Sequence, residues 1–518
     1  MNWHTLANLQ LPPGYSPDDL RKLLERRVKP TGATLLSHRV LRESLDARGT
    51  PKWMLHVAVL LDRPVSSLPS WETPPELTVP LLPARVREDV APIVIGAGPA
   101  GLCAAWLLAR AGLRPVLVDR GADVDRRRAG WTDFERSRRF STAASLVFGE
   151  GGAGTFSDGK LTTRRNDPLL SEFFQWLVRH GAPGDILYRA KPHVGSDQLQ
   201  RVLPQIRAEL TELGATFLWN TDVTAFVLRE GRLDRLETSA GPLPCTDVFV
   251  ATGTSGEALL PALEAAGVRI TPRPLQLGVR MEQPAAQISA AVYGRNARLP
   301  GLPAAEYQFV LRPAAVYSSG LRPGEARSFC MCPGGSVVCS AATDGQLVVN
   351  GMSLRARDGA FSNAALIVTL PPLPDWRAAV DLRADLERRA FDAGGGTWAA
   401  PAQTVSSFLR NNSPEVVSTS YRFGATPYDL RALLPATLTD ALAAGLRHLP
   451  GVLPGVSDGL LLAPETRVAP DWRLERDDRG CAAPGLYVLG EGSGYASGIS
   501  TSALDGLKVA LGWISGHV

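Results

Sequence analysis

Residues 91–121 read APIVIGAGPAGLCAAWLLARAGLRPVLVDRG, and this segment carries the clearest structural signal in the 518-residue chain. An apolar strand leads through a glycine turn into a helix rich in alanine and leucine. A second apolar strand follows and ends on an acidic residue. The segment is a complete βαβ unit, so it predicts an α/β fold of the Rossmann-like type.

The GxGxxG motif within this segment predicts a dinucleotide-binding site. Gly96 permits the tight turn, Gly98 lets the backbone approach a pyrophosphate, and Gly101 allows the helix to pack closely on the strand. The phosphates would lie at the positive end of the helix that follows the turn. Asp119 lies 23 residues after Gly96 and can accept hydrogen bonds from ribose hydroxyls. The expected contacts of this segment are Gly96, Gly98, Pro99, Ala100, Gly101, Asp119 and Arg120.

Two later segments indicate which dinucleotide binds. Residues 247–256, DVFVATGTSG, form a strand that ends in Ala-Thr-Gly. Residues 485–494, GLYVLGEGSG, form a strand that ends in Gly-Glu-Gly and precedes a C-terminal helix. Both resemble the downstream FAD signatures of glutathione-reductase-type flavoproteins. The resemblance implies non-covalent FAD as the cofactor.

That resemblance also implies roles for individual residues. Glu491 would accept a hydrogen bond from a ribityl hydroxyl, and the backbone of Val223 would contact adenine. Gly498, Ile499 and Ser500 would present N–H groups and a helix dipole to the pyrimidine edge of the flavin, where they stabilise the anionic reduced form. The remaining cofactor contacts expected from these segments are Thr252, Gly253 and Gly490.

Residues 148–161, FGEGGAGTFSDGKL, match GxGxxG a second time. No helix-forming run follows, and no acidic residue closes a second strand, so a second nucleotide site is disfavoured. We interpret the segment as a glycine loop against the flavin ring, with contacts from Gly151, Gly152 and Ser157. Lys160 would face the flavin or the substrate, or else lie on the surface.

The rest of the chain divides around these signatures. Ser16 to Asp19 resembles a helix capping box, residues 52–61 are typical of a strand, and seven prolines fall between Pro64 and Pro92. The predicted organisation is a small α+β appendage (1–63), a Pro-rich linker (64–90), the first part of an FAD domain (91–271), an inserted α+β substrate domain (272–460) and the last part of the FAD domain (461–518).

Several segments together resemble one bacterial family of FAD-dependent proteins or dehydrogenases with a characteristic C-terminal domain. They are SLDARG (44–49), FGEGGAGTFSDGKL (148–161), FCMCPGG (329–335), NGMS (350–353), ETR (465–467) and GEGSGYASGISTSALDGL (490–507). The chain has ETRVAP and GYASGI where the family usually has ETRTSSP and GYAGGI. The resemblance implies an FAD domain interrupted by a substrate domain, and it does not supply a substrate.

Two cysteines in the insert are candidates for chemistry. Cys330 and Cys332 lie at strand spacing, hence on one face. A zinc site is disfavoured because no partner pair of His or Cys lies nearby. The pair is either a redox dithiol or two packed strand thiols. Cys103 stands alone in the first βαβ unit and no CxxC or CxxxxC motif follows that unit, which disfavours a disulfide-reductase mechanism.

Arginines of the insert are the other catalytic candidates. An arginine that faces a flavin can clamp a carboxylate or stabilise an enolate, and a tyrosine can supply a proton. The predicted catalytic residues are Arg410, Tyr421, Arg422 and Arg467. Glu465 is expected to pair with a neighbour rather than act as a base.

Composition excludes several classes of protein. The net charge of +4 does not demand a nucleic-acid or acidic-membrane partner, and six cysteines do not make a disulfide scaffold. No apolar run reaches the roughly 18 residues of a membrane helix. Because the first residues, MNWHTLANLQ, do not resemble a signal peptide, we expect a cytoplasmic protein.

The sequence therefore predicts an FAD-dependent oxidoreductase that transfers hydride between flavin N5 and a small organic substrate, by reduction of an activated double bond or by dehydrogenation. NAD(P)H could act as a transient donor, and so could an electron-donor protein. One alternative is an RNA-associated flavoprotein of tRNA modification, which the balanced charge of the N-terminal unit disfavours. Another is a flavin-binding protein without catalysis.

Overall fold

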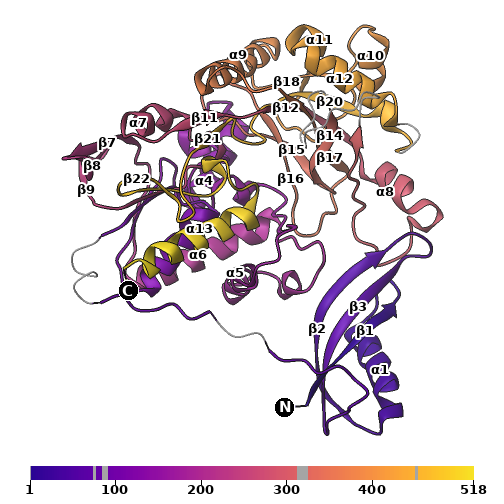
Figure 1. The fold of residues 1–518 in the computed structure, drawn as a ribbon. Helices are drawn as coiled ribbons and strands as arrows, with labels where there is room; N and C mark the ends of the chain where they lie inside the picture. The colour runs from indigo at the N-terminus through magenta and orange to yellow at the C-terminus, as the bar shows by residue number, and fades with distance from the viewer. Residues whose placement is uncertain (1, 74–76, 84–90, 312–324, 450–452, 518) are drawn as a thin grey trace.

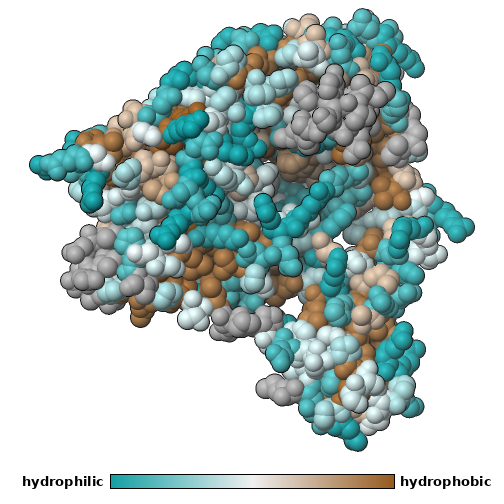
Figure 2. Space-filling model, in the orientation of Figure 1, coloured by the Kyte–Doolittle hydropathy of each residue, from teal (hydrophilic) through white to brown (hydrophobic). Residues whose placement is uncertain are grey.

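The computed structural model describes residues 2–73, 77–83, 91–311, 325–449 and 453–517. Two sheet-based units lie side by side, and a smaller N-terminal unit projects from them (Figure 1). The face drawn in Figure 2 is covered mainly by hydrophilic side chains, with apolar ones scattered among them. Within the described residues, no helix is long and apolar enough to cross a membrane.

The predicted βαβ unit forms β4 (Ile93–Ile95), α3 (Pro99–Arg110) and β5 (Val116–Val118). Strand β4 pairs in parallel with β5 on one side and with β10 (Val248–Val250), the strand of the Ala-Thr-Gly signature, on the other. The six-stranded sheet has the order β22-β23-β10-β4-β5-β6. Its other strands are β6 (Thr216–Leu218), β22 (Cys481–Ala483) and β23 (Leu486–Val488). We call this unit the nucleotide domain.

The first and last helices of the nucleotide domain cross in close contact. Helix α13 (Ile499–Ser515) packs on α3, and both bury apolar side chains in one core. The crossing depends on Gly506, where an added Cβ would lie 2.2 Å from the carbonyl oxygen of Ala100. The other long helices of this domain are α4 (Val124–Ser137), α5 (Pro168–Arg179) and α6 (Ser196–Glu212). A hairpin sheet and a short helix lie at its edge, formed by β7 (Val223–Arg229), β8 (Arg232–Thr238), β9 (Leu243–Pro244) and α7 (Leu260–Ala265).

The inserted unit, here called the insert domain, is built on a seven-stranded sheet of order β13-β14-β17-β12-β20-β18-β19. Its strands are β12 (Leu275–Pro284), β13 (Val310–Leu311), β14 (Ala326–Cys332), β17 (Phe361–Leu370), β18 (Ala400–Thr404), β19 (Ala425–Pro427) and β20 (Leu460–Glu465). Strand β20 pairs with β12 inside this sheet. The expected end of the insert at residue 460 is therefore too early, because β20 still belongs to the insert sheet and the chain returns to the nucleotide domain only after it.

One face of the insert sheet carries the core of that domain, where Ala364, Leu366 and Val368 pack among apolar residues of the helices. The helices are α8 (Ala285–Tyr293), α9 (Trp376–Ala393), α10 (Val405–Arg410), α11 (Leu430–Leu433) and α12 (Ala436–Leu446), and a hairpin joins β15 (Ser336–Cys339) to β16 (Val349–Met352). On the opposite face, Ala365 and Ile367 pack against Val468.

The chain passes between the two domains twice, once in each direction. At the crossing, β11 (Ile270–Pro272) and β21 (Trp472–Leu474) pair antiparallel. This two-stranded connection places one face of the insert sheet against the nucleotide domain.

The N-terminal unit is a sheet of order β1-β3-β2 with one helix, as the sequence predicts. Its elements are β1 (Trp3–Leu11), α1 (Pro17–Val28), β2 (Leu35–Asp46) and β3 (Lys52–Leu61). Ser16 and Asp19 form the expected capping box of α1. Residues 74–76 and 84–90 of the predicted linker lie outside the described residues, and Leu82 packs in the core of the nucleotide domain.

The crossing of α3 and α13 gives a testable prediction. Gly506→Ala should destabilise the protein by about 1–3 kcal/mol, because the new methyl group overpacks against the Ala100 carbonyl. Gly512→Ala in the same helix has its nearest neighbour at 3.9 Å and should stabilise the protein by about 0.5–1 kcal/mol. Chemical denaturation of both variants measures the difference, and equal shifts would contradict the packing argument.

Candidate FAD site

A cavity of about 590 Å³ lies between the nucleotide domain and the insert domain. On one side it begins at the carboxyl ends of β4, β5 and β10, where open α/β sheets bind their ligands. On the other side it ends at residues 328–331 of β14 in the insert sheet. One continuous space therefore joins a nucleotide site to the sheet of the second domain.

The glycine turn after β4 forms the wall of this cavity nearest the sheet. Gly96 has a φ of +102°, and an added Cβ would lie 2.4 Å from the carbonyl oxygen of Ala251. Gly98 lies against Gly152 of the second glycine loop, with 3.9 Å between its added Cβ and the Gly152 Cα. Gly101 packs behind the turn, where a Cβ would meet the Gly96 carbonyl oxygen at 1.9 Å. Because these glycines have no side chains, a pyrophosphate could lie close to the backbone of the turn.

Asp119 lines the cavity, and its carboxylate also organises the loops around it. Its Oδ2 accepts a hydrogen bond from the Ala97 N–H at 2.8 Å, and its Oδ1 accepts from Gly121 and Gly149, each at 2.8 Å. These bonds use both lone pairs of Oδ1 and one of Oδ2, so Oδ2 keeps a lone pair for a ribose hydroxyl. Next to it, the Arg120 guanidinium lies 4.2 Å from the centre of the Phe148 ring.

The N-terminus of α13 closes the far end of the cofactor side. Gly498 precedes the helix with a φ of +78°, and in the described structure no side chain caps the first turn. Glu491 accepts a hydrogen bond from the Gly498 N–H at 3.3 Å, and burial raises the pKa of Glu491 to about 7. Ser500 lines the cavity while its hydroxyl donates to the Leu161 carbonyl at 2.8 Å. The helix dipole and the uncapped N–H groups are directed toward the cavity.

These features fit FAD. The turn without Cβ atoms suits a pyrophosphate, the Asp119 carboxylate suits a ribose, and the uncapped helix start suits the electron-rich edge of a flavin. Of the expected cofactor contacts, those that line the cavity are Gly96, Gly98, Pro99, Ala100, Asp119, Arg120, Gly152, Ser157, Lys160, Val223, Thr252, Gly253, Glu491, Gly498, Ile499 and Ser500. The others, Gly101, Gly151 and Gly490, lie behind the wall. The Gly151 N–H donates to the Ala97 carbonyl, and the Gly490 N–H donates to Asp505.

Three of the four predicted catalytic residues lie away from the cavity. Tyr421 is buried in the insert core, where its hydroxyl donates to the Trp398 carbonyl at 2.9 Å. Arg422 is the next residue and therefore points outward, with 76% of its side chain exposed. Arg410 is exposed at the end of α10. Alternation along the chain at 421–423 turns the arginine away from the side on which the aromatic residues pack.

Arg467 does line the cavity, but its guanidinium already has partners. Its Nη1 donates to Glu257 at 2.6 Å and to the Ser255 hydroxyl at 3.2 Å, and its Nη2 donates to Glu387 at 3.0 Å. Two carboxylates therefore neutralise it. Arg467 thus joins the nucleotide domain to α9, and its expected role as a substrate clamp stays a prediction.

The insert side of the cavity is organised by Arg280, which the sequence did not single out. This arginine of β12 is completely buried. Its Nη1 donates to both oxygens of Glu465, at 2.9 and 3.0 Å, which confirms that Glu465 pairs with a neighbour. Its Nη2 donates to the Cys330 carbonyl at 2.7 Å and to Cys332 Sγ at 3.3 Å. Burial raises the pKa of Glu465 to about 7 although Arg280 opposes this.

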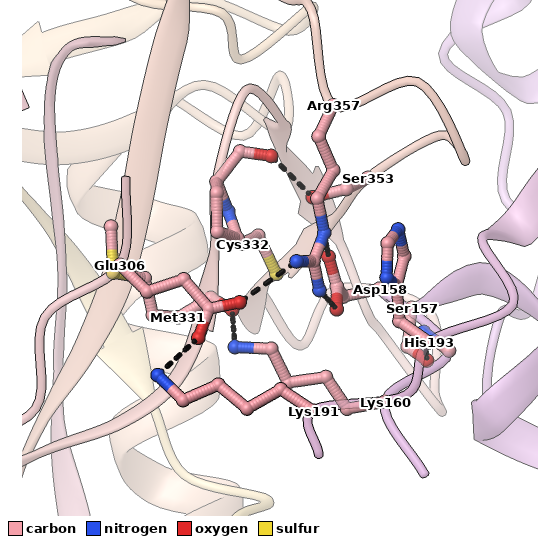
Figure 3. Close-up of polar contacts among 12 residues, drawn as sticks. Ser157, Asp158, Lys160, Lys191, His193, Glu306, Met331, Cys332, Ser353 and Arg357 are labelled. Carbon is pink, nitrogen blue, oxygen red and sulfur yellow. Dashed lines mark hydrogen bonds and ion pairs between the residues drawn. The ribbon is translucent and has the colours of Figure 1, made fainter. Parts of the chain in front are cut away.

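A second polar cluster joins the glycine loop of the nucleotide domain to the insert (Figure 3). Arg357 pairs with Asp158 of that loop and donates to Glu306 at 2.8 Å. Lys191 approaches Glu306 from the other side, at 3.2 Å. Burial opposes ionisation of Glu306, but the surrounding cations hold its pKa down at about 2. Sequence reasoning missed Arg357 and Glu306, whose partners lie more than fifty residues away along the chain.

Lys160 also links the two domains. Its Nζ donates to the Met331 carbonyl at 2.6 Å, and the residue lines the cavity. Of the alternatives left open by the sequence, the structure places Lys160 at the cavity rather than on the outer surface.

Comparison with known proteins agrees with this geometry. Residues 274–468 match the family model described as "FAD-dependent protein, C-terminal domain-like", and residues 94–152 match a model of the NAD(P)-binding Rossmann-like domain. An uncharacterized protein of Clostridium beijerinckii is 37% identical over 432 residues, which cover 81% of this chain and 80% of the relative. The chain belongs to this family of FAD-dependent proteins. FAD is accordingly the cofactor of this member.

The solved structures are less similar to this chain than the Clostridium relative is. L-proline dehydrogenase from P. horikoshii is 12% identical, with 82% of this chain and 94% of that chain covered and a TM-score of 0.35. CtdE in complex with FAD is 12% identical, with 82% and 84% covered and a TM-score of 0.32. These values are too low to carry an argument about this FAD-dependent protein.

The hydrogen bonds of Asp119 generate a prediction. Asp119→Asn should lower the FAD retained after dialysis and destabilise the protein by about 1–3 kcal/mol, because an amide cannot accept hydrogen bonds through both of its terminal atoms. Flavin absorbance and denaturation measure the two effects. Asp234→Asn, which changes a partly exposed carboxylate paired with Arg235 on β8, is the matched control. Unchanged flavin content in Asp119→Asn would remove Asp119 from the cofactor site.

Proposed function

We propose that this protein is an FAD-dependent oxidoreductase that acts on a small organic molecule, bound between the flavin and the insert sheet. The continuity of the cavity from the glycine turn to β14 carries this proposal, because the same cavity is lined by the expected cofactor contacts and by side chains of the insert sheet. Bound FAD supplies hydride transfer at N5. A cytoplasmic location stays a prediction from the sequence.

The protein's own residues supply positioning and charge at this site. The N-terminus of α13 would stabilise negative charge on the reduced ring. At the insert end, Glu465, Asn350 and Cys330 face the cavity. These groups can hydrogen-bond a polar substrate and move a proton, which a dehydrogenation or the reduction of an activated double bond requires.

One experiment tests both the electron donor and the substrate class. Anaerobic titration of the purified holoprotein with NADH, NADPH and a panel of metabolites should bleach the flavin absorbance with at least one reagent. Rapid bleaching by an organic substrate supports a dehydrogenase, and bleaching by NAD(P)H supports a reductase with a transient nicotinamide donor. A flavin that none of these compounds reduces would contradict the proposal and favour the non-catalytic alternative.

A further inference from the structure

Cys330 occupies an irregular position in β14. Pairing with β17 joins Phe329 to Ala365 and Cys332 to Asn363, so β14 contains one extra residue at this point. Such a β-bulge redirects a side chain and is frequent beside active sites. Cys330 also has a φ of +41°, in the left-handed region that residues other than glycine rarely adopt.

The bulge separates neighbouring side chains. Met331 packs in the core of the insert domain, and Cys332 is completely buried beside Arg280. Cys330 is partly exposed and lines the FAD cavity. Cys330 is thus accessible to a molecule in the cavity, whereas Cys332 is not.

Cations approach Cys330 from both domains. Arg280 donates to its carbonyl oxygen at 2.7 Å, and Lys160 of the nucleotide domain donates to the carbonyl oxygen of the next residue at 2.6 Å. Three carboxylates also face this region. Glu465 is bound by Arg280, Asp158 is paired with Arg357, and Glu491 accepts a hydrogen bond from the backbone at the start of α13.

The balance of these groups favours a thiolate. The neighbouring Cys332 side chain, whose Sγ donates to the Cys330 carbonyl oxygen at 3.6 Å, lowers the pKa of the Cys330 thiol, burial opposes this, and the nearby charges of Arg280 and Lys160 lower the pKa further. The pKa of Cys332 is correspondingly raised. A base is most effective when its pKa is close to the working pH, so a thiolate here is suited to proton transfer.

We propose that Cys330 is the proton-transfer residue of the site, taking a proton from the substrate when the substrate is oxidised and returning it when the substrate is reduced. The inference rests on the proposed function. In the oxidation, the substrate loses a hydride to the flavin and an acidic C–H, N–H or O–H proton to the Cys330 sulfur. A double bond forms in the substrate, and the resulting thiol later releases its proton to water.

The first test measures the thiol itself in the full-length holoprotein. The rate of alkylation of Cys330 by iodoacetamide, followed by mass spectrometry against pH, should have a midpoint well below the roughly 8.5 of a free cysteine. Cys332→Ala should raise that midpoint, because it removes the neighbouring side chain that lowers the pKa of Cys330 most. Cys245→Ala, a change in the core of the nucleotide domain, should leave it unchanged. An ordinary midpoint, or a Cys330–Cys332 disulfide in the isolated protein, would overturn the proposal.

The second test uses any substrate that bleaches the flavin. Cys330→Ala should retain FAD but reduce the rate of flavin reduction by about 100-fold or more. In the wild-type protein this rate should rise with pH through the alkylation midpoint, because the base acts in its deprotonated form. Equal rates in the two proteins would overturn the role of Cys330 and leave the proposed function intact. If no compound bleaches the flavin, the proposed function fails, and the alkylation midpoint alone decides whether Cys330 is a low-pKa thiol.

Discussion

The buried ion pairs of Arg467 hold the two walls of the FAD cavity in place. This guanidinium bridges Glu257, which follows the Ala-Thr-Gly strand, and Glu387 on α9 of the insert. Close by, Arg383 of α9 pairs with Asp471 where the chain returns to the nucleotide domain. Removing one partner of such a buried pair typically costs about 3–5 kcal/mol, because an uncompensated charge stays inside. These pairs join the two domains beside the cavity, together with the β11–β21 connection and the contacts of Arg357 with Asp158 and of Lys160 with Met331.

With the walls fixed, segments far apart in the sequence meet at one space. The glycine loop contributes Asp158 and Lys160, FCMC contributes Cys330, NGMS contributes Asn350, ETR contributes Glu465 and the C-terminal segment contributes Glu491. The segments by which the family is recognised, apart from SLDARG in the N-terminal unit, are thus those that build the cavity. Glycines and helix N-termini make up its cofactor side, and ionisable groups around Arg280 make up its insert side. This division suits the proposed function, in which backbone groups hold the cofactor and side chains of the insert contact the substrate.

Much of the fold could be predicted from the sequence because it depends on local pattern. The βαβ unit, the capped helix of the N-terminal unit and the Ala-Thr-Gly strand all form where they were expected. The catalytic arginines and Tyr421 could not be placed in the same way. An aromatic residue beside an arginine has the same appearance in sequence whether it faces a cofactor or a core, and at residues 421–423 the packing of Tyr421 and Phe423 with Trp398 and Phe134 decided the orientation.

The sequence by itself therefore determined a dinucleotide site, since close approach to a dinucleotide requires glycine at fixed spacing and an acidic residue at the end of the second strand. The resemblance of two later segments to flavoprotein signatures indicated that this dinucleotide is FAD. It also determined that an insert separates the two parts of the FAD domain. Only the tertiary structure decided which ionisable groups face the flavin side of that insert. Arg280, Cys330 and Glu465 lie on three strands, and their contact comes from the pairing of β12 with β20 and from the bulge in β14. Sheet register and buried charge compensation are non-local, so no pattern within a short segment encodes them.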